Sequence, residues 1–542
     1  MSTPSPFIKV PSGGPRNANV MLVGEAPGAH EAAKGVPFIG PSGEDLNRML
    51  HEAGFLRTEC FVTNVCKYRP PGNDIDAFFL DSKQLRPNEM IVEGLAELKA
   101  EIEEVQPKLI IALGKTALWG LTGKRGITKW RGSQLDYNGI PLIPTYHPAL
   151  IQYEWSWRAI AVHDLKRAKK VLEEGQNKPT YNFIVRPSYV QCLDTLEQLI
   201  QRATNDSNRG PFPLAVDLET RSGHIACVGL AWNRTDAICI PAMCVERPLG
   251  YWTAEEDLAI WLKLRGLLEH PNVEVIGQNF LYDAQYFSRR WGYVPRLRHD
   301  TMFMQHVMFA GMPKSLDFLA SMYCEYYVYW KDEGKTWDPR TPEEQLWVYN
   351  CLDAVATWEI TTKLLPALRS ANLDEQYNFQ MRLWWPVLRM MLRGIGVDAK
   401  RRGVVAEELF SALQTRELAL REIVGHDINI RSPKQMKELF YGELQQKVVK
   451  AKKTFQPTTN DAALETIAIR EPLLRPMTKM IREMRSIGVF ISNFIKAQLD
   501  PDGRMRCSFN PAGTETYRFS SSTSAFDTGT NLQTIPEGNE DE

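Results

Sequence analysis

Four acidic residues, widely separated in the sequence, are of the types that bind divalent cations. Asp217 and Glu219 lie in the run AVDLET, Asp283 lies in GQNFLYDAQYF, and Asp353 lies in WVYNCLDAVATWEI. Carboxylates that converge inside a protein repel one another by roughly several kcal/mol, so a fold that collects them needs metal ions to neutralise the charge. The set therefore predicts a metal site.

The secondary structure expected around these residues can bring their side chains together. The period of two along a strand places Asp217 and Glu219 on one face. Asp283 lies at the start of an expected helix. Tyr349 and Asp353 are four residues apart, and this spacing places them on one face of a helix.

A second group of residues that could do chemistry lies near the N-terminus. The stretch NVMLVGEAPGAHEAAKGVPFIGPSG predicts a buried strand, a glycine-rich loop and a helix. A helix N-terminus after such a loop favours an anion. However, Gly24 and Gly28 do not form the dinucleotide fingerprint G-x-G-x-x-G, and Glu25 stands where phosphate would lie. We therefore do not expect an NAD site.

Strand-like runs alternate with helical stretches through this first region, which predicts a parallel α/β sheet. The strand-like runs are NVMLVG, CFVTNV, KLIIALG and PLIPTYH, and the helical stretches lie near 42–53, 88–106 and 156–173. Strand ends carry Glu25, Asn64 and His147, and the loop after the first strand carries Phe38. A carboxylate, an amide, a histidine and an aromatic face suit a pocket for an extruded base.

The first region resembles the family 4 uracil-DNA glycosylases. GEAPGAHE, GVPFIGPSG, VTNVCKYRPPGN, ALGKTAL and TYHPAL match that family's pattern over roughly the first 170 residues. The resemblance implies that Phe38 stacks on a flipped uracil, Asn64 bonds its Watson–Crick edge, and Glu31 crowds the C5 position against thymine. It also implies that Glu25 lies by the attacking water and that His147 stabilises the negative charge developing on uracil.

That family usually holds an iron–sulfur cluster on four cysteines. The first region contains only Cys60 and Cys66. We therefore expect no iron–sulfur cluster. Loss of the cluster could accompany loss of activity, so an inactive domain that holds DNA is an alternative to an active glycosylase.

The second region resembles the DEDDy-type 3′-5′ exonucleases that proofread for family A DNA polymerases. AVDLET, GQNFLYD and the Y-x-x-x-D pattern follow one another in that family's order. The resemblance implies a ribonuclease-H-like fold with a mixed sheet. It implies that Asp217 bridges two Mg²⁺ ions, or Mn²⁺ in their place, while Glu219, Asp283 and Asp353 complete the shells and Tyr349 orients the attacking water. The alternative is a fold kept for structure after loss of activity.

The third region is expected to be mainly helical and resembles the start of the polymerase domain of family A DNA polymerases, whose long helices form the thumb. Ser432 precedes a proline and a helical run, which predicts a helix start. In the segment SFNPAGTETYRFSSS the resemblance implies that Thr514, Thr516 and Arg518 contact the backbone or minor groove of primer-template DNA, positioning it without reading sequence.

The catalytic aspartates of that polymerase family follow the motif NLQTIP, and this sequence stops soon after it, at Glu542. We therefore expect that the chain by itself lacks a complete polymerase site. Either it is a truncated piece of a longer enzyme, or a second polypeptide supplies the rest. On the second interpretation the chain is a DNA-binding half of a split polymerase.

The bulk composition is that of an ordinary globular protein with several domains. The chain has 542 residues, 44% hydrophobic and 24% charged, which is too long for one core. A net charge of −1 excludes a generally basic DNA-coating protein. Nine cysteines without C-x-x-C pairs and no membrane-spanning run indicate a soluble protein, and we expect it in the cytoplasm of a bacterial or phage-infected cell.

The expected fold class is α/β in the first two regions and mainly helical in the third. The expected domains are 15–175, 185–370 and 375–542. Together the motifs predict a DNA replication and repair protein whose partners are single-stranded 3′ ends, primer-template DNA and uracil-containing DNA.

Overall fold

The computed structural model describes residues 7–81, 86–205, 210–247, 249–335, 343–452 and 454–535. Contacts divide the chain into two compact units, Met1–Met381 and Arg382–Glu542. Helix α15 (Asp374–Arg393) runs across the division. None of the described helices is long and apolar enough to cross a membrane.

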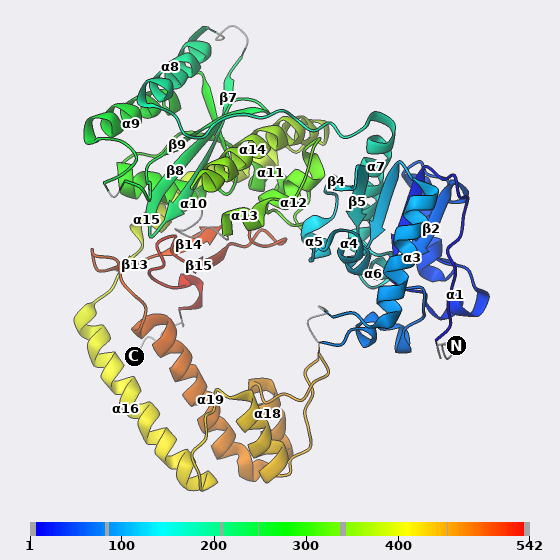
Figure 1. Cartoon of the computed structure of the whole chain (residues 1–542). Helices are drawn as coiled ribbons and strands as arrows, with labels where there is room; N and C mark the ends of the chain where they lie inside the picture. Colours follow the sequence, from blue (N-terminus) through cyan, green and yellow to red (C-terminus); the bar gives the residue numbers. More distant parts are fainter. Residues whose placement is uncertain are drawn as a thin grey trace. The chain divides into compact units, whose positions relative to one another are not determined.

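A five-stranded sheet in the order β2-β1-β3-β5-β4 forms the N-terminal part of the first unit (Figure 1). Its strands are β1 (Val20–Gly24), β2 (Cys60–Asn64), β3 (Leu109–Leu113), β4 (Leu135–Tyr137) and β5 (Ile140–Thr145). All neighbours are parallel except β4 and β5. Alternate residues of β1 enter two separate cores, Val20 and Leu22 in one and Met21 and Val23 in the other. The sheet is therefore buried on both faces, as parallel sheets are.

Helices cover both faces of this sheet and confirm the alternation that the sequence predicts. Residues of α2 (Pro41–Glu52), α6 (Pro148–Tyr153) and α7 (Arg158–Glu174) complete one core. Residues of α3 (Glu89–Val105) and α4 (Lys115–Thr122) complete the other. The shorter helices α1 (Ala29–Lys34) and α5 (Ile127–Trp130) lie in connections.

A six-stranded mixed sheet in the order β11-β10-β7-β8-β9-β6 forms the rest of the first unit. Its strands are β6 (Asn182–Ile184), β7 (Phe212–Arg221), β8 (His224–Ala231), β9 (Asp236–Pro241), β10 (Val273–Gly277) and β11 (Leu297–Asp300). The strands β7, β8 and β9 are antiparallel neighbours, whereas β10 is parallel to β7 and to β11. The expected mixed sheet is confirmed.

The long helix α14 (Glu344–Ser370) packs against β7, β8 and β9 of the mixed sheet (Figure 1). The other helices of this part are α8 (Tyr189–Asn205), α9 (Ala254–Leu268), α10 (Leu281–Tyr286), α11 (Thr301–Met308), α12 (Leu316–Tyr323) and α13 (Lys331–Lys335). One face of α14 is almost fully buried, including Trp347, Asn350 and Asp353. Most of the buried residues of this helix are apolar, so the buried polar groups of Asn350 and Asp353 need hydrogen-bond partners.

A buried ion pair joins the two sheet regions of the first unit. The Arg131 guanidinium and the Asp164 carboxylate are 1% and 0% exposed. Arg131 Nε donates to Asp164 Oδ2 at 2.9 Å, and Arg131 Nη1 donates to Ser321 Oγ, on α12, at 2.8 Å. Thr145 Oγ1 also donates to Asp164 Oδ2, at 2.8 Å.

Replacement of Asp164 by alanine is expected to destabilise the first unit by about 3–5 kcal/mol, because it leaves a buried guanidinium without its carboxylate. The melting temperature, measured by calorimetry, is expected to fall by about 5 °C or more. The matched control is Asp194→Asn at an exposed position of α8. Equal melting temperatures for the Asp164 variant and the unmodified chain would contradict the expected role of the pair.

The second unit is mainly helical, as predicted, with two short strand pairs. Its main elements are α16 (Ala399–Val424), α17 (Pro433–Lys437), α18 (Asp461–Arg470), α19 (Arg475–Phe490), β12 (Ile395–Gly396), β13 (Arg504–Met505), β14 (Cys507–Asn510) and β15 (Ser520–Thr523). Helix α19 packs on α16 and α18 around an apolar core that includes Leu420, Leu464 and Ile481. Ser432 caps α17 with its side-chain oxygen, which confirms the predicted helix start.

Candidate functional sites

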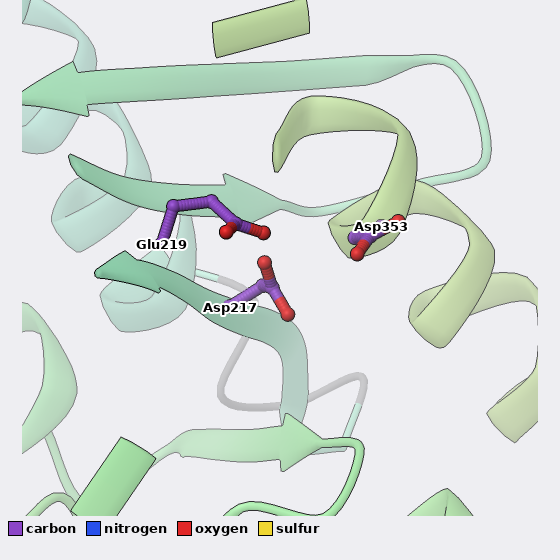
Figure 2. Close-up of side chains that lie close together, drawn as sticks. All are labelled: Asp217, Glu219 and Asp353. Carbon is purple, nitrogen blue, oxygen red and sulfur yellow. The ribbon is translucent and has the colours of Figure 1, made fainter. Parts of the chain in front are cut away.

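Three of the four predicted metal ligands converge in the mixed-sheet part of the first unit. Asp217 and Glu219 project from β7, and Asp353 projects from α14 (Figure 2). Each offers a carboxylate oxygen, and these oxygens all lie within 4.8 Å of one another. Oxygen ligands at this spacing fit a hard divalent cation such as Mg²⁺ or Mn²⁺.

An amide from α14 fixes the first of these carboxylates. Asn350 Nδ2 donates to Asp217 Oδ2 at 2.7 Å and to the Asp217 backbone oxygen at 3.2 Å. Gly229 on β8 lies opposite Asp217 in the strand register. A Cβ atom at Gly229 would lie 2.6 Å from Asn350 Oδ1, so only glycine leaves room for this amide.

Two neighbouring residues hold the carboxylate of Asp353. Trp330 Nε1 donates to Asp353 Oδ1 at 2.7 Å. Lys331 forms an ion pair with Asp353, and its Nζ donates to the Tyr349 hydroxyl at 2.8 Å. A Cβ at Gly334 would lie 2.7 Å from the Tyr349 ring, so α13 packs closely on this tyrosine.

Asp283, the fourth predicted ligand, lies beside the cluster and not within it. The residue is buried in the first turn of α10. Its Oδ1 accepts a hydrogen bond from the Leu218 backbone N–H at 3.0 Å, between the two acidic residues of β7. The carboxylate therefore braces β7, and its role as a metal ligand stays a prediction.

Burial and mutual repulsion raise the pKa values of three carboxyl groups at this site. Burial, and then the charge of Asp353, raises the pKa of Asp217 to about 8. Burial also raises the pKa of Glu219 and of Asp283 well above the usual range, and Asp217 contributes to both shifts. The site therefore holds more negative charge than its surroundings stabilise, and a divalent cation fits that need.

Metal binding to this site is expected to release protons and to strengthen as pH rises from about 6 to about 8. The reason is that Asp217, with a pKa of about 8, carries a proton over much of this range, and a ligand must lose it. Calorimetric Mn²⁺ titrations in two buffers of different ionisation enthalpy measure the release directly. A metal affinity that does not change between these pH values would contradict the assignment.

The predicted base-binding residues meet at the carboxyl ends of the first sheet. Asn64 ends β2 and pairs in register with Gly24 at the end of β1. A Cβ at Gly24 would lie 2.3 Å from Asn64 Oδ1 and 2.4 Å from Phe38 Cζ, so the amide and the ring both contact this glycine. Asn64 is 3% exposed, and its Oδ1 finds no hydrogen-bond partner among the residues that the structure describes.

Glu31 holds the loop that carries Phe38. Its two carboxylate oxygens accept hydrogen bonds from the backbone N–H groups of Gly28 and Phe38. Phe38 has a φ of +55°, a conformation that is strained for a non-glycine residue and needs such support. The carboxylate takes the anion position at the helix N-terminus, and its predicted contact at C5 of uracil is not tested by this geometry.

The side chain of His147 lies near the ring of Phe38, and its neutral imidazole has an N–H group that can donate a hydrogen bond. It caps α6, where its Nδ1 accepts from the Ala149 N–H at 3.2 Å, so the ring proton is on Nε2. Burial lowers the pKa of His147 to about 4. Its ring centroid lies 6.1 Å from that of Phe38. A neutral imidazole here can donate to an oxygen on which negative charge develops.

Glu25 lies at the start of the loop after β1, half-buried, with Thr116 as its partner. Thr116 Oγ1, in the first turn of α4, donates to Glu25 Oε2. Burial raises the pKa of the Glu25 carboxyl. The hydrogen bond from Thr116 thus fixes one carboxylate oxygen of Glu25.

The predicted DNA-contacting residues of the second unit lie in the connection between β14 and β15. Thr516 and Arg518 are exposed there. Within this connection, Thr514 Oγ1 donates to the Arg518 backbone oxygen at 2.7 Å. The hydrogen bond closes the loop and presents the Arg518 side chain outward, so the expected DNA contacts stay predictions.

The sequence reasoning missed four residues that contact the predicted ones: Asn350, Trp330, Lys331 and Thr116. Asn350 has a usable signal, because it is three residues before Asp353 and hence on the same helix face. The other three are separated from their partners by at least 18 residues and give no spacing signal.

Three family models match consecutive parts of the chain. They are the uracil DNA glycosylase superfamily at residues 11–172, a 3′-5′ exonuclease at residues 187–369, and DNA polymerase family A at residues 402–542. The type-4 uracil-DNA glycosylase of Thermotoga maritima is 36% identical over 163 residues, which are 29% of this chain and 80% of that protein. The first region belongs to the uracil-DNA glycosylases. The family matches that follow this glycosylase region confirm the other two resemblances.

Two DNA polymerases are also similar to this glycosylase-containing chain. The DNA polymerase of Bacillus phage SP01 is 22% identical over 597 aligned residues, covering 94% of this chain and 62% of that protein. DNA polymerase I of Bacillus caldotenax is 33% identical over 191 residues, covering 34% of this chain and 20% of that protein. The chain thus spans less than two thirds of the polymerases that it matches.

Proposed function

We propose that the chain is a 3′-5′ exonuclease of a DNA polymerase, combined with a uracil-DNA glycosylase module. The observation that carries the nuclease is the convergence of Asp217, Glu219 and Asp353 within 4.8 Å. The family matches support a role in DNA replication and repair.

In the nuclease site, Asp217, Glu219 and Asp353 would hold two Mg²⁺ ions, or Mn²⁺, with Asp283 assisting through water. Such ions stabilise the charge on the attacking and leaving oxygens of a phosphodiester. The chain's own part is to fix the carboxylates, through Asn350 and the Leu218 N–H. Tyr349 would orient the attacking water at the 3′-terminal phosphodiester.

In the glycosylase site, Phe38 would stack on a flipped uracil and Asn64 would bond its Watson–Crick edge. The unpartnered, buried Asn64 Oδ1 supports this role, since a buried acceptor without a partner is costly. His147 would donate to the uracil oxygen as the glycosidic bond breaks, and Glu25 would hold the water. Glu31 would act by keeping Phe38 in its strained conformation and by crowding C5.

The cysteines of this module do not fit an iron–sulfur cluster with four thiolates. Cys60 and Cys66 are the region's only cysteines, and Cys66 Sγ donates to the Tyr68 oxygen at 3.4 Å. Burial raises the pKa of both thiols to about 11, which favours the neutral form. We therefore propose that the module works without this cluster.

In the second unit, Thr514, Thr516 and Arg518 would contact primer-template DNA, because the loop leaves Thr514 partly exposed and Thr516 and Arg518 exposed, and Arg518 adds a positive charge. The alternative function of the chain is a DNA-holding part that needs a second polymerase polypeptide.

An assay on 5′-labelled single-stranded DNA tests the proposal. Purified chain with Mg²⁺ is expected to shorten the strand from its 3′ end, and EDTA is expected to stop it. Tight DNA binding without shortening, at any Mg²⁺ or Mn²⁺ concentration, would reject the nuclease and favour the DNA-holding alternative.

A further inference from the structure

A lysine ammonium lies inside the carboxylate site. The side chains of Lys331 and Asp353 are 19% and 4% exposed, so their ion pair is largely withdrawn from water. The other oxygen of Asp353 accepts from Trp330 Nε1 at 2.7 Å. Both oxygens of the Asp353 carboxylate therefore accept a hydrogen bond from the protein. For the Glu219 carboxylate of the same cluster, the described residues provide no hydrogen-bond donor.

The same ammonium sets the orientation of a second group in the site. Lys331 Nζ donates to the Tyr349 hydroxyl oxygen at 2.8 Å. An ammonium has donors only, so the tyrosine oxygen must be the acceptor. The phenolic proton is then free to point away from Lys331 and to donate to a water or a phosphate oxygen.

The positive charge also affects cation binding. A positive charge at ion-pair distance from a carboxylate stabilises that carboxylate and repels a second cation that approaches it. Lys331 stabilises the carboxylates when no metal is bound, and it repels a divalent ion that approaches Asp353. Its charge would therefore lower the affinity of the site for metal, while its contacts hold Asp353 and Tyr349 in place.

We propose that Lys331 is a further positioning residue of the exonuclease site, which competes with the divalent ion for Asp353 and aims the hydroxyl of Tyr349. This inference rests on the proposed nuclease function. It assigns two opposite effects to one side chain, weaker metal binding and faster hydrolysis. A residue that served only to pack α13 would not produce that combination.

The test is Lys331→Met, which removes the charge and keeps the length, in the full chain. Mn²⁺ binding is measured by calorimetry, and single-turnover hydrolysis of 3′-labelled DNA is measured at saturating metal. We expect metal binding to tighten by about threefold or more and hydrolysis to slow by about tenfold or more. Lys331→Arg, which keeps the charge, is expected to restore the metal affinity of the unmodified chain.

Lys129→Met is the matched control. Lys129 Nζ forms an ion pair with Asp332 Oδ1 of α13 at 3.1 Å, and Asp332 is not one of the three clustered carboxylates. This variant is expected to leave both quantities unchanged. Unchanged or weaker metal binding in Lys331→Met would overturn the proposal, as would unchanged hydrolysis at saturating metal. If the unmodified chain hydrolyses no DNA, the nuclease assignment fails, and the metal titration still decides whether Lys331 competes for Asp353.

Discussion

Replacement of Asp217 by asparagine is expected to reduce 3′-end hydrolysis by about a thousandfold or more. Asp217 supplies one of the three converging carboxylates, and asparagine keeps its shape while removing the charge that holds the cations. Bound metal ions contribute several kcal/mol to such reactions, and each 1.4 kcal/mol or so corresponds to a factor of ten. Single-turnover assays on 3′-labelled single-stranded DNA measure the effect.

Glu255→Gln provides the control for this prediction. Glu255 is an exposed acid in the first turn of α9, in the same part of the chain, and its neutralisation is expected to leave the rate within about twofold. DNA affinity should be measured for both variants by titration, since a loss of binding would imitate a loss of chemistry. Hydrolysis by Asp217→Asn at a rate close to that of the unmodified chain would show that another site cleaves the DNA.

Replacement of Asn64 by alanine is expected to reduce uracil excision by about a hundredfold or more. Asn64 is the last residue of β2 and is 3% exposed, and its Oδ1, which has no hydrogen-bond partner among the described residues, lies against the same glycine as Phe38. Loss of a positioned donor or acceptor in a buried site costs about this much in rate. Alkali-labile sites formed in uracil-containing DNA are the measurement.

The control is Asn47→Ala on the exposed face of α2, which changes the same residue type away from the pocket. It is expected to leave excision unchanged. If the unmodified chain produces no alkali-labile sites above background, the first module is a DNA-holding domain, and the nuclease prediction is unaffected because its residues lie in a different sheet.

Sequence alone determined the local parts of both sites. The strand period places Asp217 and Glu219 on one side of β7, and the helix period places Tyr349 and Asp353 on one side of α14, where Lys331 contacts both. The alternation of strand-like and helical stretches likewise predicted the parallel strands of the first sheet. These features depend on backbone geometry over a few residues, which the residue pattern records directly.

Only the tertiary structure decided which partners the buried polar side chains of both sites contact. In the folded chain, Asp283 accepts a hydrogen bond from the Leu218 N–H. Glu31 accepts one from the Phe38 N–H, and Lys331 forms an ion pair with Asp353. Each of these contacts depends on the packing of elements that are far apart in the chain. Each also depends on which buried polar group would cost the most free energy without a hydrogen-bond partner. The types and spacing of residues do not encode that competition, because it is settled by desolvation and geometry once the elements have packed.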